Sequence, residues 1–351
     1  MTESNVFDVT IIGAGPAGLF STFYSGLREM KTKVIESSQQ LGGKLNVYTE
    51  KMVWDIGGVP PSPAGKIIDD LVAQAKVFEP TIITGEKVIK IDRNAENVFV
   101  LTTDTGQTHF SKAIILATGY GVIKPNKLTI QGAETYELTN LQYTVQKPQS
   151  MKDKVVMISG GGDSAVDWAN ILEPIAKKVY LVYRQGELKS HEAEITKLMN
   201  SSVTCHLNTT IEKLVADESQ RRIKEVVLTN SQGGSLNIPV DEMVINHGFE
   251  SENTLFENNT VGLELHDEYY VLTNSQSASA VPGVFAAGDV VMHDAKLHLI
   301  AGAFQDAVNA VNQAKSYVDP TAFNRGRVSS HNDKFTEKNQ DLIQQFFVEG
   351  K

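Results

Sequence analysis

Cysteine is almost absent from this chain of 351 residues, since Cys205 is the only one. A single cysteine excludes an internal disulfide, a CxxC redox pair and a zinc or iron–sulfur site built from several thiolates. Long apolar runs are also absent, because no segment approaches the roughly 18 residues of a membrane-spanning helix. Lys and Arg number 32 against 42 Asp and Glu, and the net charge of −10 argues against a nucleic-acid partner.

The N-terminal segment 1–5 has no basic cluster, and the apolar stretch after it is short and broken by Asp8 and Thr10. This pattern is not that of a secretory signal, so we expect a cytoplasmic protein. Hydrophobic residues make up 41% of the chain, which is enough for a packed core. At roughly 100–200 residues per domain, the length predicts two domains.

The first strong pattern is a β-branched strand at 6–12 that runs into Gly13-Ala14-Gly15-Pro16-Ala17-Gly18. A helix is expected at 19–29 and a second strand at 32–35, which ends in Glu36 roughly twenty residues after the glycines. In GxGxxG the first glycine, Gly13, permits the tight turn and the second, Gly15, lets the backbone approach a pyrophosphate. The third, Gly18, lets the helix pack close to the strand. Glu36 is placed to accept hydrogen bonds from a ribose.

The same pattern recurs in the middle of the chain. A strand at 154–159 leads into Gly160-Gly161-Gly162-Asp163-Ser164-Ala165, and the next strand, 179–183, ends in Arg184. Gly160, Gly162 and Ala165 take the three small-residue positions, with Asp163 and Ser164 between them. An arginine where the first copy has a glutamate favours a 2′-phosphate on the ribose, and Lys189 is expected to assist. The sequence therefore predicts two dinucleotide sites.

A third motif, Gly288-Asp289, follows a buried strand and precedes a small-residue helix expected at 297–317. A carboxylate there can bind a polyhydroxyl chain. The catalytic motifs GxSxG and HExxH are absent, the histidines are scattered, and we expect no metal site. The chain thus supplies binding sites and no nucleophile, as in enzymes whose cofactors carry the chemistry.

Shorter elements are expected around these motifs. The sequence predicts antiparallel strands at 108–111, 204–207, 223–229 and 234–239, a buried strand at 113–117 that leads into Thr118-Gly119, and a final helix at 341–348.

Six segments together resemble a known family. They are GAGPAG at 13–18, Glu36, LGGKL at 41–45, ATG at 117–119, GGGDSAVDWA at 160–169 and FAAGDV at 285–290. In order and spacing they resemble the low-molecular-weight thioredoxin reductases. The CxxC of those enzymes is missing here. The best match is the thioredoxin-reductase-like, type 2 ferredoxin–NADP+ reductase family.

The resemblance implies an α/β fold of two three-layer Rossmann-like domains, the second inserted in the first. An FAD-binding domain would comprise 1–118 and 248–351, with a C-terminal extension from about 319, and an NAD(P)H-binding domain would comprise 119–247. It also implies a homodimer, with ferredoxin or flavodoxin as the partner. Hydride would pass from the nicotinamide to the flavin, followed by single electrons to the partner.

The resemblance further implies site residues. Tyr48 would stack on one face of the flavin and His331 would cover the other. Further FAD contacts would come from Ala14, Pro16, Glu36, Gly43, Lys44, Asp55, Val88, Ala117, Ile123, Asp289 and Asn332.

Three questions stay open at this point. The family usually has His-Arg-Arg-Asp-x-Phe-Arg where this chain has Tyr183-Arg184-Gln185-Gly186-Glu187-Leu188-Lys189, so NADPH is expected and NADH use is left open. The scaffold could instead serve reduction of a small disulfide, a quinone or free flavin. A non-catalytic flavin-binding sensor is the third alternative.

Overall fold

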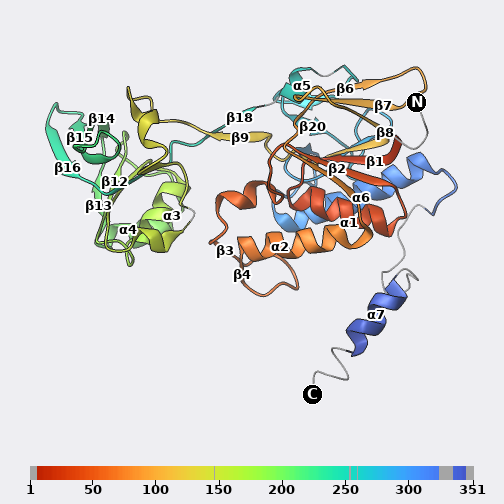
Figure 1. Ribbon diagram of the computed structural model, residues 1–351, viewed down its shortest axis with the longest axis horizontal. Helices are drawn as coiled ribbons and strands as arrows, with labels where there is room; N and C mark the ends of the chain where they lie inside the picture. Colours follow the sequence, from red (N-terminus) through yellow and green to blue (C-terminus); the bar gives the residue numbers. More distant parts are fainter. Residues whose placement is uncertain (1–5, 146, 253, 259, 324–334, 345–351) are drawn as a thin grey trace. The chain divides into compact units, whose positions relative to one another are not determined.

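The computed structural model describes residues 6–145, 147–252, 254–258, 260–323 and 335–344. The chain divides into two compact units (Figure 1). The first unit comprises Met1–Asn46, Met52–Val122 and Asn253–Lys351, and the second comprises Val47–Lys51 and Ile123–Glu252. The sequence places the two crossings at 118/119 and 247/248, and no sequence pattern assigns the short segment Val47–Lys51 to the second unit.

The first unit is built on a seven-stranded sheet in the order β5-β2-β1-β8-β7-β6, with β21 beside β8. Its strands are β1 (Val6–Ile12), β2 (Thr32–Glu36), β5 (Thr81–Thr84), β6 (Val88–Arg93), β7 (Phe99–Thr103), β8 (Thr108–Leu116) and β21 (Val284–Ala286). β5, β2, β1, β8 and β21 are parallel, whereas β6 and β7 are antiparallel. Parallel strands end at one edge, so their following loops gather there.

Strand β8 unites two segments that the sequence predicts as separate strands. Its first half, Thr108–Ser111, pairs antiparallel with β7, and its second half, Ile114–Leu116, pairs parallel with β21. Both halves pair with β1 along its length. The prediction of a break was wrong because the polar residues Ser111 and Lys112 resemble a turn, whereas continuous pairing with β1 holds them in the strand.

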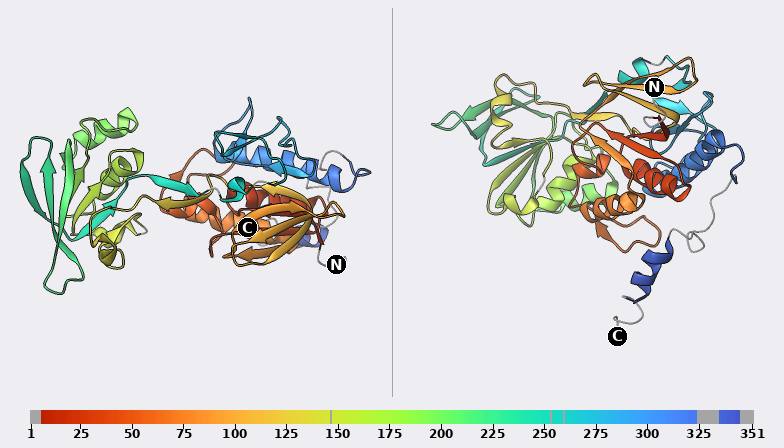
Figure 2. Two further views of the ribbon diagram at one scale, coloured as in Figure 1. Left: turned by 90° about the horizontal axis from the view of Figure 1, so that it is seen from above. Right: turned by 45° about the vertical axis from the view of Figure 1, so that its right-hand side comes forward.

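Helix α1 (Pro16–Leu27) lies between α2 (Ala64–Ala75) and α6 (Ile300–Val318), as Figure 1 and the right-hand view of Figure 2 show. The close approach of α1 and α6 depends on small residues, among them Ala303, Ala307 and Ala310, which are all buried. This packing brings the beginning of α6 near the glycine turn that precedes α1.

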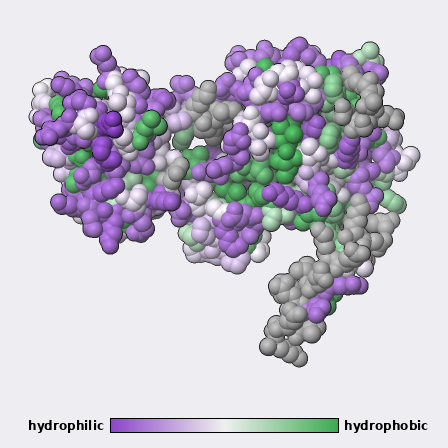
Figure 3. All heavy atoms as spheres, in the orientation of Figure 1, coloured by the Kyte–Doolittle hydropathy of each residue, from purple (hydrophilic) through white to green (hydrophobic). Residues whose placement is uncertain are grey.

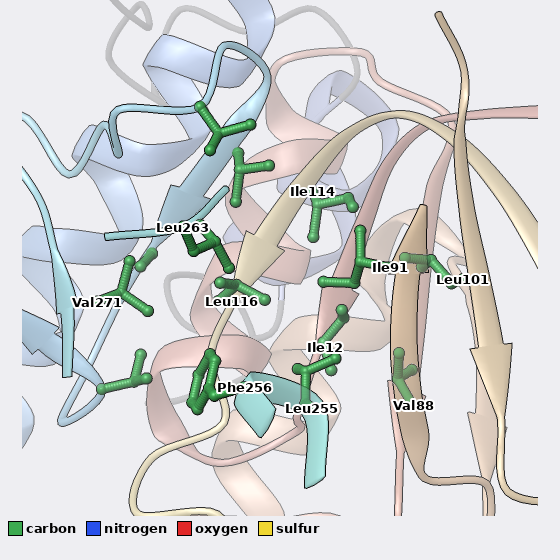
Figure 4. Close-up of a cluster of buried hydrophobic side chains, with 14 of the residues drawn as sticks. Ile12, Val88, Ile91, Leu101, Ile114, Leu116, Leu255, Phe256, Leu263 and Val271 are labelled. Atoms are coloured by element: carbon green, nitrogen blue, oxygen red, sulfur yellow. The ribbon is translucent and has the colours of Figure 1, made fainter. Parts of the chain in front are cut away.

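The main core of the first unit joins the strands to segments from the C-terminal third of the chain (Figure 4). Ile12 and Leu116 from the parallel strands belong to this cluster with Leu101 of β7, Phe256 of α5 (Thr254–Glu257) and Val271 of β20 (Tyr270–Leu272). The first unit is therefore assembled from both ends of the sequence.

Smaller elements complete this unit. They are the 3₁₀ helices η2 (Gly43–Val47) and η3 (Lys76–Phe78), the strand pair β3 (Met52–Val53) and β4 (Ser62–Pro63), the strands β19 (Leu265–His266) and β22 (Val291–Met292), and helix α7 (Thr336–Ile343). The predicted final helix at 341–348 was placed too late, since α7 begins directly after Phe335, whose ring contacts Phe78 at 5.5 Å between centroids. Residues 345–348 lie outside the described residues.

The second unit has a five-stranded parallel sheet in the order β10-β17-β11-β12-β13 and a three-stranded antiparallel sheet, β14-β15-β16. The strands are β10 (Leu141–Gln142), β11 (Val155–Ser159), β12 (Lys178–Val182), β13 (Thr204–His206), β14 (Thr209–Ala216), β15 (Ile223–Asn230), β16 (Ser235–Pro239) and β17 (Glu242–Ile245). The helices are α3 (Asp163–Leu172), α4 (Glu192–Met199), η4 (Ala133–Tyr136) and η5 (Pro148–Met151). β9 (Val122–Pro125) and β18 (Phe249–Glu252) form a two-stranded pair where the chain crosses between units.

Two sequence predictions in the second unit need correction. The segment at 204–207 was expected to be antiparallel, but β13 is a parallel edge strand in which Cys205 pairs with Leu181. Strand β14 was missed. A register shift between Ile211 and Lys213 breaks its apolar alternation, and period-2 patterns cannot detect a bulged strand.

Among the described residues, no helix is both long and apolar enough to cross a membrane.

Prediction on Asn140. This buried amide joins the antiparallel sheet of the second unit to its parallel sheet. It donates to the carbonyls of Ile223 (2.7 Å) and Asp241 (2.9 Å) and accepts from the Ile223 N–H (2.9 Å). We expect Asn140→Ala to lower the free energy of unfolding of this unit by about 3 kcal/mol, because three backbone groups lose their partner. Urea unfolding measures this, with the exposed Asn237→Ala as control, and equal effects of both changes would contradict the assignment.

Candidate functional site

The first glycine turn leaves no room for side chains. Gly13 has φ +100°, and a Cβ there would lie 2.4 Å from the Ala117 carbonyl oxygen. A Cβ on Gly18 would lie 1.9 Å from the Gly13 carbonyl oxygen. The Gly13 N–H donates to Ile35 and the Ala117 N–H donates to Ile12, both at 2.8 Å. The turn is thus held between β2 and β8, at the carboxyl edge of the sheet.

A second loop comes against this turn. Gly43 has φ +58°, and a Cβ on it would lie 2.7 Å from Cα of Gly15. The Gly42 N–H donates to the Ala14 carbonyl at 2.8 Å, which pins the loop in place. Gly15 caps α1 without a side-chain hydrogen bond, and Pro16 is the first residue of the helix. The free N–H groups and positive end of α1 suit a phosphate, and a bare backbone lets one approach.

Glu36 lies at the end of β2, beside the glycine turn. Its side chain is buried, and it accepts hydrogen bonds from the N–H groups of Ala14 (2.7 Å) and Ser38 (2.8 Å). These charge-assisted bonds hold the carboxylate against the turn. Oε1 also accepts from the Ser37 hydroxyl at 3.1 Å, whereas Oε2 accepts from the Ala14 N–H and keeps a lone pair to which a ribose hydroxyl can donate.

The Gly288-Asp289 turn packs against the same place. Gly288 has φ +83°, and a Cβ there would lie 2.9 Å from the Ala17 Cβ at the start of α1. The Asp289 carboxylate is partly exposed and lies 3.7 Å from Nδ1 of His298. The Thr118 hydroxyl, next to the glycine turn, is buried and without a hydrogen-bond partner in the described structure. The first unit therefore combines a phosphate cradle with a buried hydroxyl that lacks a partner among the described groups and with a partly exposed carboxylate, which fits a bound dinucleotide.

An aromatic group beside Asp289 was missed by the sequence analysis. The Lys44 ammonium lies 5.1 Å from the ring centroid of Tyr120, which stacks on Tyr269 at 5.9 Å with an interplanar angle of 8°. The Tyr269 hydroxyl donates to the Gly119 carbonyl. Burial, and then the nearby charge of Asp289, raise the pKa of Tyr120 to about 12, so its phenol is neutral at physiological pH. The only sequence signal for Tyr120 was its position directly after Thr118-Gly119.

The second glycine turn has the same construction in the second unit. Gly160 has φ +149°, and a Cβ there would lie 2.3 Å from the Asn246 carbonyl oxygen. A Cβ on Gly161 would strike the Tyr183 ring at 2.2 Å. The Lys189 N–H donates to the Gly161 carbonyl at 2.7 Å, which brings the backbone of Lys189 against the turn.

Helix α3 begins at this turn with a free N-terminus. Gly162 caps it without a side-chain hydrogen bond, Asp163 and Ser164 are exposed in the first turn, and Ala165 is buried. Arg184, at the end of β12, is exposed. The hydroxyl of Ser190, next to Lys189, is buried without a hydrogen-bond partner among the described groups. These features fit a second phosphate-bearing ligand.

His247 is a further polar residue here that the sequence analysis passed over. It follows β17, and its Nε2 lies 2.8 Å from the Ser159 hydroxyl at the end of β11. Burial lowers the pKa of His247, and the Arg184 guanidinium lowers it further, so the imidazole is neutral at physiological pH. Its position at the carboxyl end of a buried strand, before Gly248, was the available signal.

The predicted FAD contacts of Val88, Asp55 and Ile123 stay predictions. Val88 begins β6 and is buried in the main core, Asp55 is exposed after β3, and Ile123 lies in β9. His331 and Asn332 lie outside the described residues.

Tyr48 belongs to the segment Val47–Lys51, which is part of the second unit. The Thr144 hydroxyl donates to the Val47 carbonyl at 2.8 Å, and Lys51 pairs with Asp167 of α3 at 2.5 Å. Tyr48 itself is half-buried. Its stacking role stays a prediction.

Comparison with known proteins bears on the whole chain. A family described as pyridine nucleotide-disulphide oxidoreductase matches residues 7–314. A curated protein named ferredoxin–NADP reductase 1 from Bacillus cytotoxicus is 55% identical over 346 residues, 98% of this chain and 99% of that protein. One of the same name from Lysinibacillus sphaericus is 51% identical over 346 residues, again 98% of this chain and 99% of that protein.

Solved structures show the same fold. The thioredoxin reductase of Lactococcus lactis superposes with a TM-score of 0.72 at 23% identity, over 89% of this chain and 99% of that one. The bacillithiol disulfide reductase of Bacillus cereus superposes with a TM-score of 0.67 at 18% identity, over 89% of this chain and 99% of that one. At these identities the likeness is one of fold.

Prediction on Gly43. We expect Gly43→Ala to weaken FAD binding at least tenfold, because alanine disfavours φ +58° and its Cβ would push the loop away from Gly15. Titration of the FAD-free protein by flavin fluorescence measures the dissociation constant. Gly57→Ala is the matched control, since nothing lies within 4 Å of that position. Unchanged affinity in Gly43→Ala would argue against the cradle.

Proposed function

This chain belongs to the pyridine nucleotide-disulphide oxidoreductase family, and on that premise we propose that it is an FAD-dependent ferredoxin–NADP+ reductase. The observation that carries the proposal is the pair of glycine turns, each at the free N-terminus of a helix, in a chain with one cysteine. The curated relatives named ferredoxin–NADP reductase 1 support it, since they align over nearly the whole chain.

FAD fits the first unit. The turn at Gly13–Gly18 and Gly43 would hold the pyrophosphate, Glu36 would accept from the adenosine ribose, and Asp289 would bind the ribityl chain. When bound, FAD supplies the conversion between hydride transfer and single-electron transfer. The protein's part is to bind and orient. The neutral phenols of Tyr120 and Tyr269 add no negative charge beside Asp289.

NADPH is the proposed ligand of the second unit. The N-terminus of α3 would hold its pyrophosphate. The exposed Arg184 guanidinium would pair with the 2′-phosphate, and Lys189 lies against the same turn. Gln185 accepts a hydrogen bond from the Tyr183 hydroxyl at 2.9 Å, so its amide NH₂ stays available to either a phosphate or a hydroxyl. NADH is therefore proposed as a slower alternative donor.

The single cysteine bears on how electrons leave the protein. Cys205 lies in β13, and burial raises its pKa, so little of it is thiolate at neutral pH. A dithiol relay is excluded because the sequence has no second cysteine. Direct transfer from the flavin to the acceptor is the route that remains, and the names of the curated relatives favour ferredoxin, or the similar carrier flavodoxin, as that acceptor.

A cytoplasmic homodimer stays a prediction. Hydrophobic residues reach the surface of the first unit, as Figure 3 shows, and Trp54 (74% exposed) and Leu297 (52% exposed) are among those of this unit. Apolar surface of this kind favours self-association.

Prediction on electron flow. We expect the purified protein to carry FAD, to lose its visible absorbance when NADPH is added without oxygen, and then to reduce ferredoxin or flavodoxin. Stopped-flow absorbance and a ferredoxin-coupled cytochrome assay measure the two steps. Flavin that resists NADPH and NADH would establish a non-redox protein. Fast reduction with turnover only on disulfides or quinones would establish the alternative reductase.

Prediction on Arg184. We expect Arg184→Gln to raise KM for NADPH about tenfold and to leave KM for NADH nearly unchanged, because only the first coenzyme loses a charge-assisted hydrogen bond. Arg221→Gln, which removes another exposed arginine of the same unit, is the control. An equal rise in KM for both coenzymes would show that Arg184 does not bind the 2′-phosphate.

A further inference from the structure

A buried group of charges ties α6 to the turn at Gly288-Asp289. The Lys296 ammonium lies 2.6 Å from Oδ2 of Asp306, and their side chains are only 3% and 7% exposed. The same oxygen accepts the N–H of Gly288 at 3.1 Å. One carboxylate oxygen thus joins two points of the chain, on either side of the stretch from Asp289 to Ala295.

His293 completes the surroundings of this carboxylate. Its Nδ1 accepts the Ala295 N–H at 3.1 Å, so the neutral ring carries its proton on Nε2. This Nε2 is buried without a hydrogen-bond partner and lies 3.8 Å from Oδ1 of Asp306. Both oxygens of Asp306 therefore face N–H groups, and Lys296 is the cation that balances it.

Stability alone does not account for this arrangement. A buried ion pair loses hydration at a large cost, and apolar side chains of similar size often stabilise a core as well. What the Asp306 carboxylate adds is a directional hydrogen bond to the backbone. Only an acceptor at the Asp306 position can hold the Gly288 N–H, and φ +83° at Gly288 gives that N–H its orientation.

We propose that Asp306 and Lys296 are positioning residues for the flavin. By this proposal Asp306 fixes the Gly288-Asp289 turn, and Lys296 fixes the segment that carries His298, so that the Asp289 carboxylate stays near His298. The inference rests on the proposed function, since Asp289 is one of the proposed FAD contacts. The pair would also affect the electrostatic potential at the flavin site, because the charges of Lys296 and Asp306 cancel there only while both residues are present.

The test compares single and double variants of the holoenzyme. Asp306→Asn leaves a buried cation, which would favour the negative charge that flavin gains on reduction. Lys296→Met leaves a buried anion, which would oppose it. We expect the flavin reduction potential to rise in Asp306→Asn and to fall in Lys296→Met. Each change should alter the ratio of reduced to oxidised flavin at least tenfold at a fixed potential, and the double variant should return near the wild type.

Affinity supplies a second measurement. FAD should bind at least tenfold more weakly to the apoprotein of both single variants, because each leaves one buried charge without its partner beside the Gly288-Asp289 turn. Asp306→Glu, which keeps the charge and shifts the carboxylate, should weaken FAD binding and keep the potential. The control is Asp319→Asn, which removes the partially exposed partner of Lys315 at the other end of α6 and should change neither property. If either single variant fails to fold, the FAD affinity of Asp306→Glu still tests the proposal.

The outcomes separate the two claims. Potentials that do not move, or that move in the same direction in both folded single variants, would overturn the positioning proposal. If neither single variant folds, unchanged FAD affinity in Asp306→Glu would overturn it. A wild-type protein that binds FAD and accepts hydride but never reduces ferredoxin or flavodoxin would overturn the proposed function and leave this inference standing.

Discussion

The close passage of Gly13 against the Ala117 carbonyl is the contact on which the first unit depends. It is possible because Gly13 has no Cβ and takes φ +100°. The contact keeps β1 beside β8 up to their ends, where the Ala117 N–H donates to the Ile12 carbonyl. The loop at Gly43 and the turn at Gly288 then pack against the beginning of α1. Three glycine-bearing segments, distant in sequence, meet at one helix N-terminus because none of them carries a side chain there.

Much of this could be predicted from the sequence. Glycine spacing, β-branched runs and an acid or arginine after the second strand are local patterns, and each reports a local backbone requirement. The parts that escaped prediction depend on tertiary contacts. The union of β8 requires its pairing with β1, and the bulge at Ile211 hides β14 from any period-2 pattern. The parallel position of Cys205 follows from its neighbour Leu181, which lies outside any local window.

The residues of the candidate site also fall into those that a local motif predicts and those that depend on tertiary contacts. Residues fixed by a motif, such as Gly15 and Glu36, lie where the sequence placed them. Tyr120 and His247 contribute through neighbours that are far away in the sequence, and a single aromatic or histidine carries no spacing signal of its own. The role of Tyr48 came from resemblance alone. Its short segment contacts α3 through Lys51, a contact that composition and periodicity do not encode.

The lack of a second cysteine and the buried Asp306 bear on one question, namely how a scaffold shared with disulfide reductases handles single electrons. Without a dithiol, the flavin is the last redox group, so its potential must be set by groups fixed in the protein. In the proposed arrangement the neutral pair of Lys296 and Asp306 would add no net charge beside the flavin, while Asp306 accepts the N–H of Gly288. Removing either charge would shift the potential in a known direction. The same two residues would thus fix geometry and keep the electrostatics balanced, which a core of apolar side chains at these positions could not do.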